Sequence, residues 1–159
     1  MIFIILLLTV FLVDLLLKKY VEAKVKSGER HLLAGGKILV RKLHNDGLAF
    51  GTLSEKPELI ERGTAGLLGV LAVYFAWLLC QPGKKVKKTG ISMVIGGGLC
   101  NGFDRFHQGF VTDYLSIPCR WKKLQSIVFN LSDICIFVGS FLYFVGSIFG
   151  KAGKTEGKR

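Results

Sequence analysis

Four long apolar blocks, separated by short polar segments, limit what this chain can fold into. They lie at about residues 2–19, 64–80, 89–106 and 126–149, and 50% of the 159 residues are hydrophobic, with a mean hydropathy of +0.45. A helix of about 20 apolar residues is long enough to cross a bilayer. The pattern therefore predicts an all-α integral membrane protein, with four transmembrane helices forming a single domain over residues 1–150.

The first apolar block could instead be a cleaved signal peptide. It lacks a basic region at its start, no convincing small-x-small cleavage site follows it, and Asp14 interrupts its apolar core. We therefore expect an uncleaved first helix. Lys18 and Lys19 would extend from its far end to the membrane surface.

The formal net charge of +11 raises the question of nucleic-acid binding. The basic residues lie between and after the apolar blocks, and they do not alternate with aromatic residues as in nucleic-acid modules. Lysines in such places set topology and contact anionic lipid. We therefore predict membrane lipid as a partner and no nucleic acid.

The distribution of lysine also predicts the topology. Four helices place both termini on one side, and the lysine cluster at 84–88 and the basic tail at 151–159 then share that side, the cytoplasm. Segment 18–63 is also rich in Lys and Arg, which argues for the opposite orientation, but the density of lysine in the short 84–88 turn outweighs it. The tail is expected to be disordered.

Residues 20–63 would then form an extracytoplasmic segment. Residues 37–43 follow the turn signal Gly35-Gly36 and have the composition of a short strand, which predicts a small β element. Asn45-Asp46-Gly47 has the composition of a turn. Residues 36–53 are expected to form a short flap or helix over a site at this face.

The four cysteines indicate neither a metal site nor a disulfide framework. Cys80, Cys100, Cys119 and Cys135 form no C-x-x-C pair, and no histidine lies at metal-ligand spacing from them. Most of them lie in or beside apolar blocks, where cysteine is a small apolar residue. We predict no metal and no cofactor.

Polar residues at the end of the third apolar block stand out against this background. Asn101, Asp104 and Arg105 have the i, i+3, i+4 spacing that places them on one face of a helix, and Asp113 follows shortly after. Asp104 and Arg105 could form a structural ion pair or hold a backbone segment. Ionisable groups near a bilayer are costly and commonly functional.

Asp133, near the start of the fourth block, is the natural partner of Asp113. The third helix ends and the fourth begins at the same face, so the two carboxylates can converge, and Asn130 shares a helix face with Asp133. A close pair of carboxylates tends to share one proton and can activate water. The alternative is that each aspartate is a helix cap or a solvated group.

Short motifs in a fixed order add to this interpretation. They are Asp-x-x-x-Lys at Asp14 and Lys18, Asn-x-Gly-x-Ala-Phe from Asn45 to Phe50, Gly-x-x-x-Asn-x-x-Asp-Arg-x-x-x-Gly-x-Val-x-Asp-Tyr from Gly97 to Tyr114, and Phe-Asn-x-x-Asp from Phe129 to Asp133. With these motifs the chain resembles the lipoprotein signal peptidases, the type II signal peptidases of bacteria, from Asp14 to about Gly139.

The resemblance implies an intramembrane aspartyl endopeptidase of the bacterial cell membrane. A monomer suffices for this chemistry, and the topology predicted from the lysines places the site toward the extracytoplasmic face. Such an enzyme would remove the signal peptide from diacylglyceryl-modified prolipoproteins, cutting before the lipidated cysteine. Asp113 and Asp133 match the catalytic pair. Five further positions match polar residues that line or shape the site, and a sixth has a supporting role in the first helix: Asn45, Asn101, Asp104, Arg105, Asn130 and Asp14.

Three features depart from the family pattern. Ser132 stands where the family usually has Ala, and Cys100 where it usually has Gly; both changes are between small residues and should leave the pair intact. Leu15 and Leu17 replace polar residues beside Asp14, so we assign Asp14 a structural role.

Two other functions compete with the peptidase. A small four-helix transporter would use Asp14 for proton coupling, and it would tolerate loss of Asp113 or Asp133 but not of Asp14. A non-catalytic membrane scaffold would carry the motifs as relics. Cleavage of a prolipoprotein by the wild-type protein, but not by the Asp113→Asn or Asp133→Asn variants, separates the peptidase from both.

Overall fold

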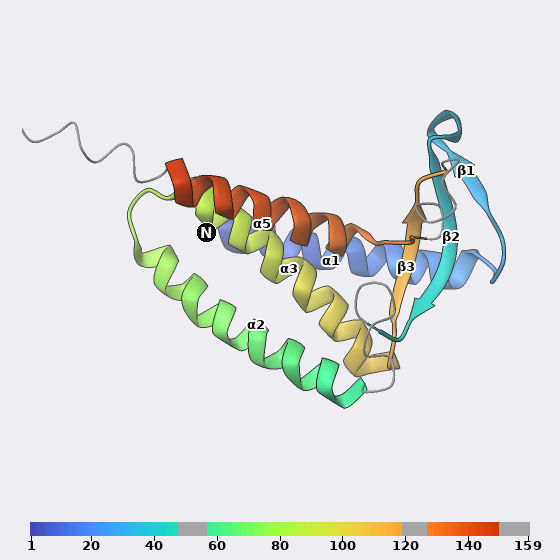
Figure 1. Ribbon diagram of the computed structural model, residues 1–159, viewed down its shortest axis with the longest axis horizontal. Coiled ribbons are helices and arrows are strands. Elements are labelled where there is room, and N and C mark those ends of the chain that lie inside the picture. The colour runs from blue at the N-terminus through green and yellow to red at the C-terminus, as the bar shows by residue number, and fades with distance from the viewer. Residues whose placement is uncertain (48–56, 119–126, 150–159) are drawn as a thin grey trace, which may run out of the picture.

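The computed structural model of the chain describes residues 1–47, 57–118 and 127–149. These residues form a bundle of helices with a three-stranded antiparallel sheet across one end (Figure 1). The helices are α1 (Ile2–Lys24), α2 (Pro57–Cys80), α3 (Lys85–Gln108) and α5 (Leu131–Phe149), with a short 3-10 helix, η1 (Ala34–Gly36). The strands, in sheet order, are β1 (His31–Leu33), β2 (Ile38–Asn45) and β3 (Val111–Ser116).

The expected mostly helical protein with a small β element is confirmed, and the strand predicted at 37–43 corresponds to β2. Helices α1, α2 and α3 run past the ends of their apolar blocks, because polar helix formers continue the backbone hydrogen bonding. Residues 48–53 of the expected flap and the tail at 151–159 lie outside the described residues.

Two of the described helices, α5 and α2 from Glu58 onward, are long and apolar enough to cross a membrane. Only 11% of the most apolar window of α2 and 17% of that of α5 are buried inside the protein, so most of these side chains face outward, as in lipid-facing helices. Helix α1 combines an apolar sequence with Asp14, Lys18 and Lys19. Helix α3 begins with lysines and ends with polar residues.

Helix α3 is central to the bundle and contacts each of the other three helices. Glycines bring its backbone close to its neighbours. A Cβ at Gly96 would lie 2.6 Å from the backbone oxygen of Leu7 on α1, and one at Gly97 would lie 2.6 Å from that of Ser132 on α5. These close approaches place the polar end of α3 beside both α1 and the start of α5.

The sheet is fastened to the end of α1. Val21 of α1 and Val25, directly after the helix, pack against Tyr114 of β3 in a buried apolar cluster. Strand β3 pairs with β2, and Leu43 lies opposite Asp113 in that register. The sheet therefore holds β3 across the end of the bundle where the third and fourth apolar blocks meet (Figure 1).

Candidate active site

Helix α5 begins with two residues that cap one another. Asn130 lies just before the helix and accepts a hydrogen bond from the backbone N–H of Asp133 at 2.9 Å, through its side-chain Oδ1. In return, Asp133 Oδ2 accepts from the backbone N–H of Asn130 at 3.1 Å. This reciprocal arrangement is a capping box built from Asn and Asp. It fixes the carboxylate of Asp133 relative to the start of its helix.

The second carboxylate, Asp113 on β3, is held by two side-chain amides. Asn130 Nδ2 donates to Asp113 Oδ1 at 2.7 Å, and Asn45 Nδ2 on β2 donates to Oδ2 at 2.9 Å. Asp113 is only 2% exposed. Asn130 therefore contacts both carboxylates, Asp133 through the cap and Asp113 through its amide nitrogen.

Burial raises the pKa of Asp113 from 3.8 to about 6. The hydrogen bonds from Asn45 and Asn130 and the positive charge of Lys18 lower this pKa, while the nearby charge of Asp133 raises it. Asn130, which binds both side chains, brings the two carboxylates close enough for the charge of one to affect protonation of the other. Such a pair titrates as a unit and retains a proton more readily than either group alone.

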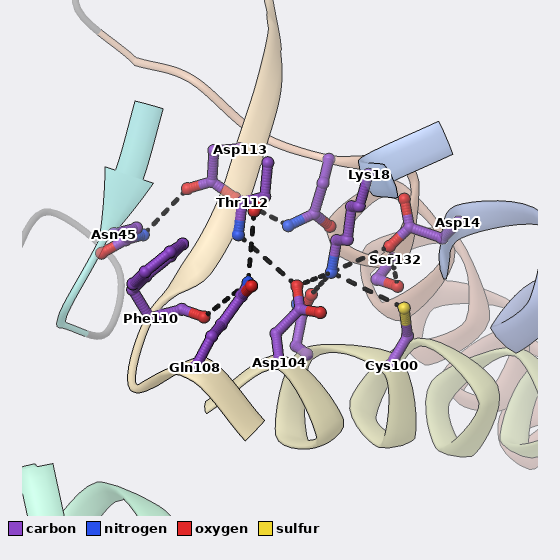
Figure 2. A network of polar contacts seen from close by, with 12 residues as sticks. Asp14, Lys18, Asn45, Cys100, Asp104, Gln108, Phe110, Thr112, Asp113 and Ser132 are labelled. Carbon is purple, nitrogen blue, oxygen red and sulfur yellow. Dashed lines mark hydrogen bonds and ion pairs between the residues drawn. The ribbon is translucent and has the colours of Figure 1, made fainter. Parts of the chain in front are cut away.

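Asp133 is held from the other side by α3. Asn101 Nδ2 donates to Asp133 Oδ1 at 2.9 Å, and Asn101 Oδ1 accepts from Lys18 Nζ at 2.7 Å. Lys18 also forms ion pairs with Asp104 at 2.9 Å and Asp14 at 3.1 Å (Figure 2). The expectation that Lys18 extends to the membrane surface is wrong: it is 2% exposed, because the buried carboxylates of Asp14 and Asp104 draw it inward. Its neighbour Lys19 is exposed.

Asp14 is fully buried, and it has one partner on each of three elements, α1, β3 and α5. Besides Lys18, it accepts from Tyr114 Oη at 2.7 Å and from Ser132 Oγ. Tyr114 Oη in turn accepts from the backbone N–H of Leu131 at 3.2 Å. Asp14 therefore joins α1 to β3 and to the first turn of α5.

Arg105 holds the turn that follows β2, while its neighbour Asp104 pairs with Lys18. Arg105 Nη2 donates to the backbone oxygen of Gly47 at 2.9 Å. The N–H of Gly47 donates to Asn45 Oδ1 at 3.1 Å, which makes the turn expected from the sequence. Asn45 thus closes a turn with its oxygen and binds Asp113 with its nitrogen.

Glu22, near the end of α1, ties the two strands of the site together. Its Oε1 lies 2.8 Å from His44 Nε2 on β2 and accepts from Thr112 Oγ1 on β3 at 2.9 Å. Lys42 of β2 pairs with its other oxygen at 3.4 Å. These contacts flank Asn45 and Asp113, so the register of the strands sets the position of both side chains.

All eight residues proposed from the sequence lie in one connected network at the sheet end of the bundle. Sequence reasoning missed Lys18, Tyr114 and Ser132 as members. The spacing of Asp14 and Lys18 could have indicated the first, and the position of Tyr114 directly after Asp113 the second. Within residues 1–47, 57–118 and 127–149, no group of three or more His, Cys, Asp or Glu side chains is arranged to hold a metal ion.

Comparison with known proteins identifies the family. The family model described as signal peptidase (SPase) II matches residues 6–149. A lipoprotein signal peptidase of Lactobacillus johnsonii is 31% identical over 144 residues, which cover 89% of this chain and 88% of that protein. The chain belongs to the signal peptidase II family. It is therefore a peptidase, and the resemblance predicted from the motifs is confirmed.

A second relative agrees with this family, and two solved structures share the fold. A lipoprotein signal peptidase of Pelotomaculum thermopropionicum is 35% identical over 134 residues, which cover 84% of this chain and 82% of that protein. Two bacterial membrane enzymes solved by the in meso method share the fold. The first has a TM-score of 0.82 and is 19% identical, and the match covers 99% of this chain and 93% of that one. The second has a TM-score of 0.78 and is 23% identical, and the match covers 92% of each chain.

Proposed function

We propose that this signal peptidase II uses Asp113 and Asp133 as a catalytic pair to remove the signal peptide from diacylglyceryl-modified prolipoproteins, cutting before the lipidated cysteine. The observation that carries the proposal is the position of Asn130, which binds Asp113 through its amide and Asp133 through the helix cap. The substrate class follows from the lipoprotein signal peptidases to which the chain is similar.

The charges around the pair favour a shared proton. Among the described residues, two cations, Lys18 and Arg105, face four carboxylates, of which Asp14, Asp104 and Asp113 are buried and Asp133 is half-buried. Full ionisation would leave excess negative charge away from water, which is costly. Lys18 pairs with both Asp14 and Asp104, so the proton is retained on Asp113 and Asp133.

A pair with one proton can hydrolyse a peptide bond without a covalent intermediate. The ionised carboxylate takes a proton from water as the water oxygen attacks the carbonyl carbon, while the protonated one donates to the carbonyl oxygen. The resulting tetrahedral diol collapses when its C–N bond breaks. One hydroxyl then gives its proton to the ionised carboxylate, and the other carboxyl group, which took its proton from water, protonates the leaving nitrogen, so the pair is restored with one proton.

The location of the site suits a substrate anchored in lipid. We place α1, α2, α3 and α5 across the bacterial cell membrane, with both termini in the cytoplasm and the sheet at the extracytoplasmic face. The outward-facing apolar residues of α2 and α5 support this arrangement. One chain contains every residue of the proposed site, so we propose a monomer in contact with membrane lipid.

Cleavage of a purified, diacylglyceryl-modified prolipoprotein tests the function. We expect the wild-type protein to release the signal peptide, and Asp113→Asn and Asp133→Asn each to lower kcat by a thousandfold or more, an order of magnitude typical of lost catalytic groups. Asp46→Asn, which removes an exposed carboxylate beside Asn45, is the control and should retain activity. Full activity in either of the first two variants would contradict the catalytic pair.

A further inference from the structure

Lys18 is the one cation of α1 that is buried among the polar groups of the site. Its ammonium has three protons and three oxygen partners: Asn101 Oδ1 at 2.7 Å, Asp104 Oδ2 at 2.9 Å and Asp14 Oδ2 at 3.1 Å. Figure 2 shows Lys18 between Asp14 and Asp104, and Cys100 Sγ is also 3.6 Å from its nitrogen. The ammonium is therefore saturated and held in place from α1 and α3.

The contact with Asn101 determines which way that carboxamide faces. Its oxygen points to the ammonium of Lys18, and its nitrogen donates to Asp133 Oδ1 at 2.9 Å. The flipped amide would place N–H groups against an ammonium and an oxygen against a carboxylate. Both contacts would then be repulsive, so Lys18 allows only the orientation that binds Asp133.

A second set of contacts leads from Lys18 toward the same helix turn. Asp14, the ion-pair partner of Lys18, accepts a hydrogen bond from Ser132, the residue before Asp133. Cys100 and Ser132, the two small-residue departures from the family pattern, therefore lie beside Lys18 and its partner. The network around Lys18 approaches Asp133 both through Asn101 and through the start of α5.

We propose that Lys18 is a positioning residue for the peptidase reaction: it fixes the carboxamide of Asn101, which in turn orients the carboxylate of Asp133. The proposal rests on the function proposed above. Lys18 contacts Asp133 through Asn101, so it acts on the reaction through another residue. Misplacement of a catalytic group by about 1 Å can lower the rate about a hundredfold.

Two matched variants test the proposal in the purified protein. In Lys18→Met a side chain of similar length lacks the ammonium, and Lys19→Met makes the same change at the exposed neighbour. We expect Lys18→Met to lower kcat per folded enzyme about 10- to 100-fold with KM within about twofold of wild type, and Lys19→Met to match wild type in both. A purely structural role would reduce the amount of folded protein but leave its kcat unchanged.

The pH profile gives a second readout. Among the described residues, the charged groups that face Asp113 are Asp133 on α5, Arg105 on α3 and Lys18 on α1. Because the charge of Lys18 lowers the pKa of Asp113, the acidic limb of kcat/KM should move to higher pH in Lys18→Met and stay in place in Lys19→Met.

A charge-balanced variant covers the case in which Lys18→Met does not fold. Removing Lys18 alone leaves buried carboxylates without a cation, which is destabilising. Lys18→Met combined with Asp104→Asn removes one charge of each sign, and Asp104→Asn alone is its reference. The combined variant should have a kcat at least about tenfold below that reference.

The outcomes separate the two proposals. A wild-type protein that leaves the modified prolipoprotein uncut overturns the proposed function and, with it, the role of Lys18. If the wild-type protein cuts the substrate and Lys18→Met has the same kcat per folded enzyme as Lys19→Met, only the role of Lys18 is overturned. The role of Lys18 is also overturned if the combined variant, Lys18→Met with Asp104→Asn, has the same kcat as Asp104→Asn alone.

Discussion

Asn130 and Asp133 cap each other at the start of α5, with hydrogen bonds of 2.9 and 3.1 Å between each side chain and the other's backbone N–H. The helix start therefore determines where the carboxylate of Asp133 lies, and it leaves the amide nitrogen of Asn130 free to bind Asp113 at 2.7 Å. A local folding feature, the helix cap, thus connects two carboxylates that lie on different elements.

Asn130→Ser separates the cap from the contact with Asp113. Serine is as good a cap as asparagine, but it has no amide nitrogen to donate to Asp113. A hydrogen bond to a charged group contributes about 1.5–3 kcal/mol, so we expect kcat/KM to fall about 10- to 100-fold while the thermal unfolding temperature stays close to wild type.

Asn130→Ala provides the comparison, because alanine removes both the cap and the donor. This variant should lose as much activity as Asn130→Ser, and its free energy of unfolding should also fall by about 1 kcal/mol. If Asn130→Ser were fully active, the bond from Asn130 to Asp113 would have no part in the reaction.

The raised pKa of Asp113 predicts a loss of activity in acid. As pH falls through about 6, Asp113 takes up a proton, and the pair then lacks the ionised carboxylate that accepts a proton from water. Asn45 lowers this pKa through its hydrogen bond, so Asn45→Ala should move the acidic limb of kcat/KM to higher pH. Asp46→Ala, at the exposed neighbouring position, should leave the limb in place; a limb unmoved by Asn45→Ala would refute this assignment.

Much of the fold and the carboxylate pair could be predicted from the sequence. Apolar blocks specify helices through their length, and the motifs around Asp113 and Asp133 specify the family. The pairing of β3 with β2 could not be predicted, because the partners lie far apart in the chain: Asn45 and Asp113 are separated by 68 positions. Short strands give little local signal, and their pairing depends on how the bundle positions them.

The burial of Lys18 shows the same limitation. A lysine at the end of an apolar helix normally extends toward the membrane surface. The i, i+4 spacing to Asp14 sets Lys18 apart from Lys19, but it does not show that Lys18 is buried. The difference depends on Asp104 of α3, which lies beside α1 only because Gly96 lets the two helices approach closely. Tyr114, likewise, contacts Asp14 only in the folded protein.

Gly97→Ala tests how the glycines of α3 position the site. The new methyl group would lie 2.6 Å from the backbone oxygen of Ser132, so α3 and α5 would have to separate next to Asp133. We expect a clear fall in the thermal unfolding temperature in detergent and a loss of activity. In Gly66→Ala on α2, the added methyl group would have no atom within 4 Å, and this control should be as stable as wild type or up to about 1 kcal/mol more stable. Equal stability of the two variants would show that the close approach at Gly97 is dispensable.

Arg105→Lys tests whether the guanidinium acts through its charge or through its hold on the backbone. Arg105 Nη2 donates to the oxygen of Gly47, whose N–H binds the side-chain oxygen of Asn45. Lysine keeps the positive charge near Asp113 and Asp133 but lacks the planar arrangement of donors. We expect Gly47 to be held less firmly, Asn45 to lose its fixed orientation toward Asp113, and kcat/KM to fall about tenfold, the effect of losing about 1.4 kcal/mol of stabilisation.

Amide hydrogen exchange at Gly47 provides the independent measurement. Exchange should accelerate in Arg105→Lys and remain at the wild-type rate in Arg62→Lys, where the arginine is exposed and pairs with Glu58 on the surface of α2. Activity lost without faster exchange at Gly47 would mean that Arg105 acts on the carboxylates by some route other than the backbone of the turn after β2. Faster exchange with full activity would mean that the anchored turn has no part in positioning Asn45 for the reaction.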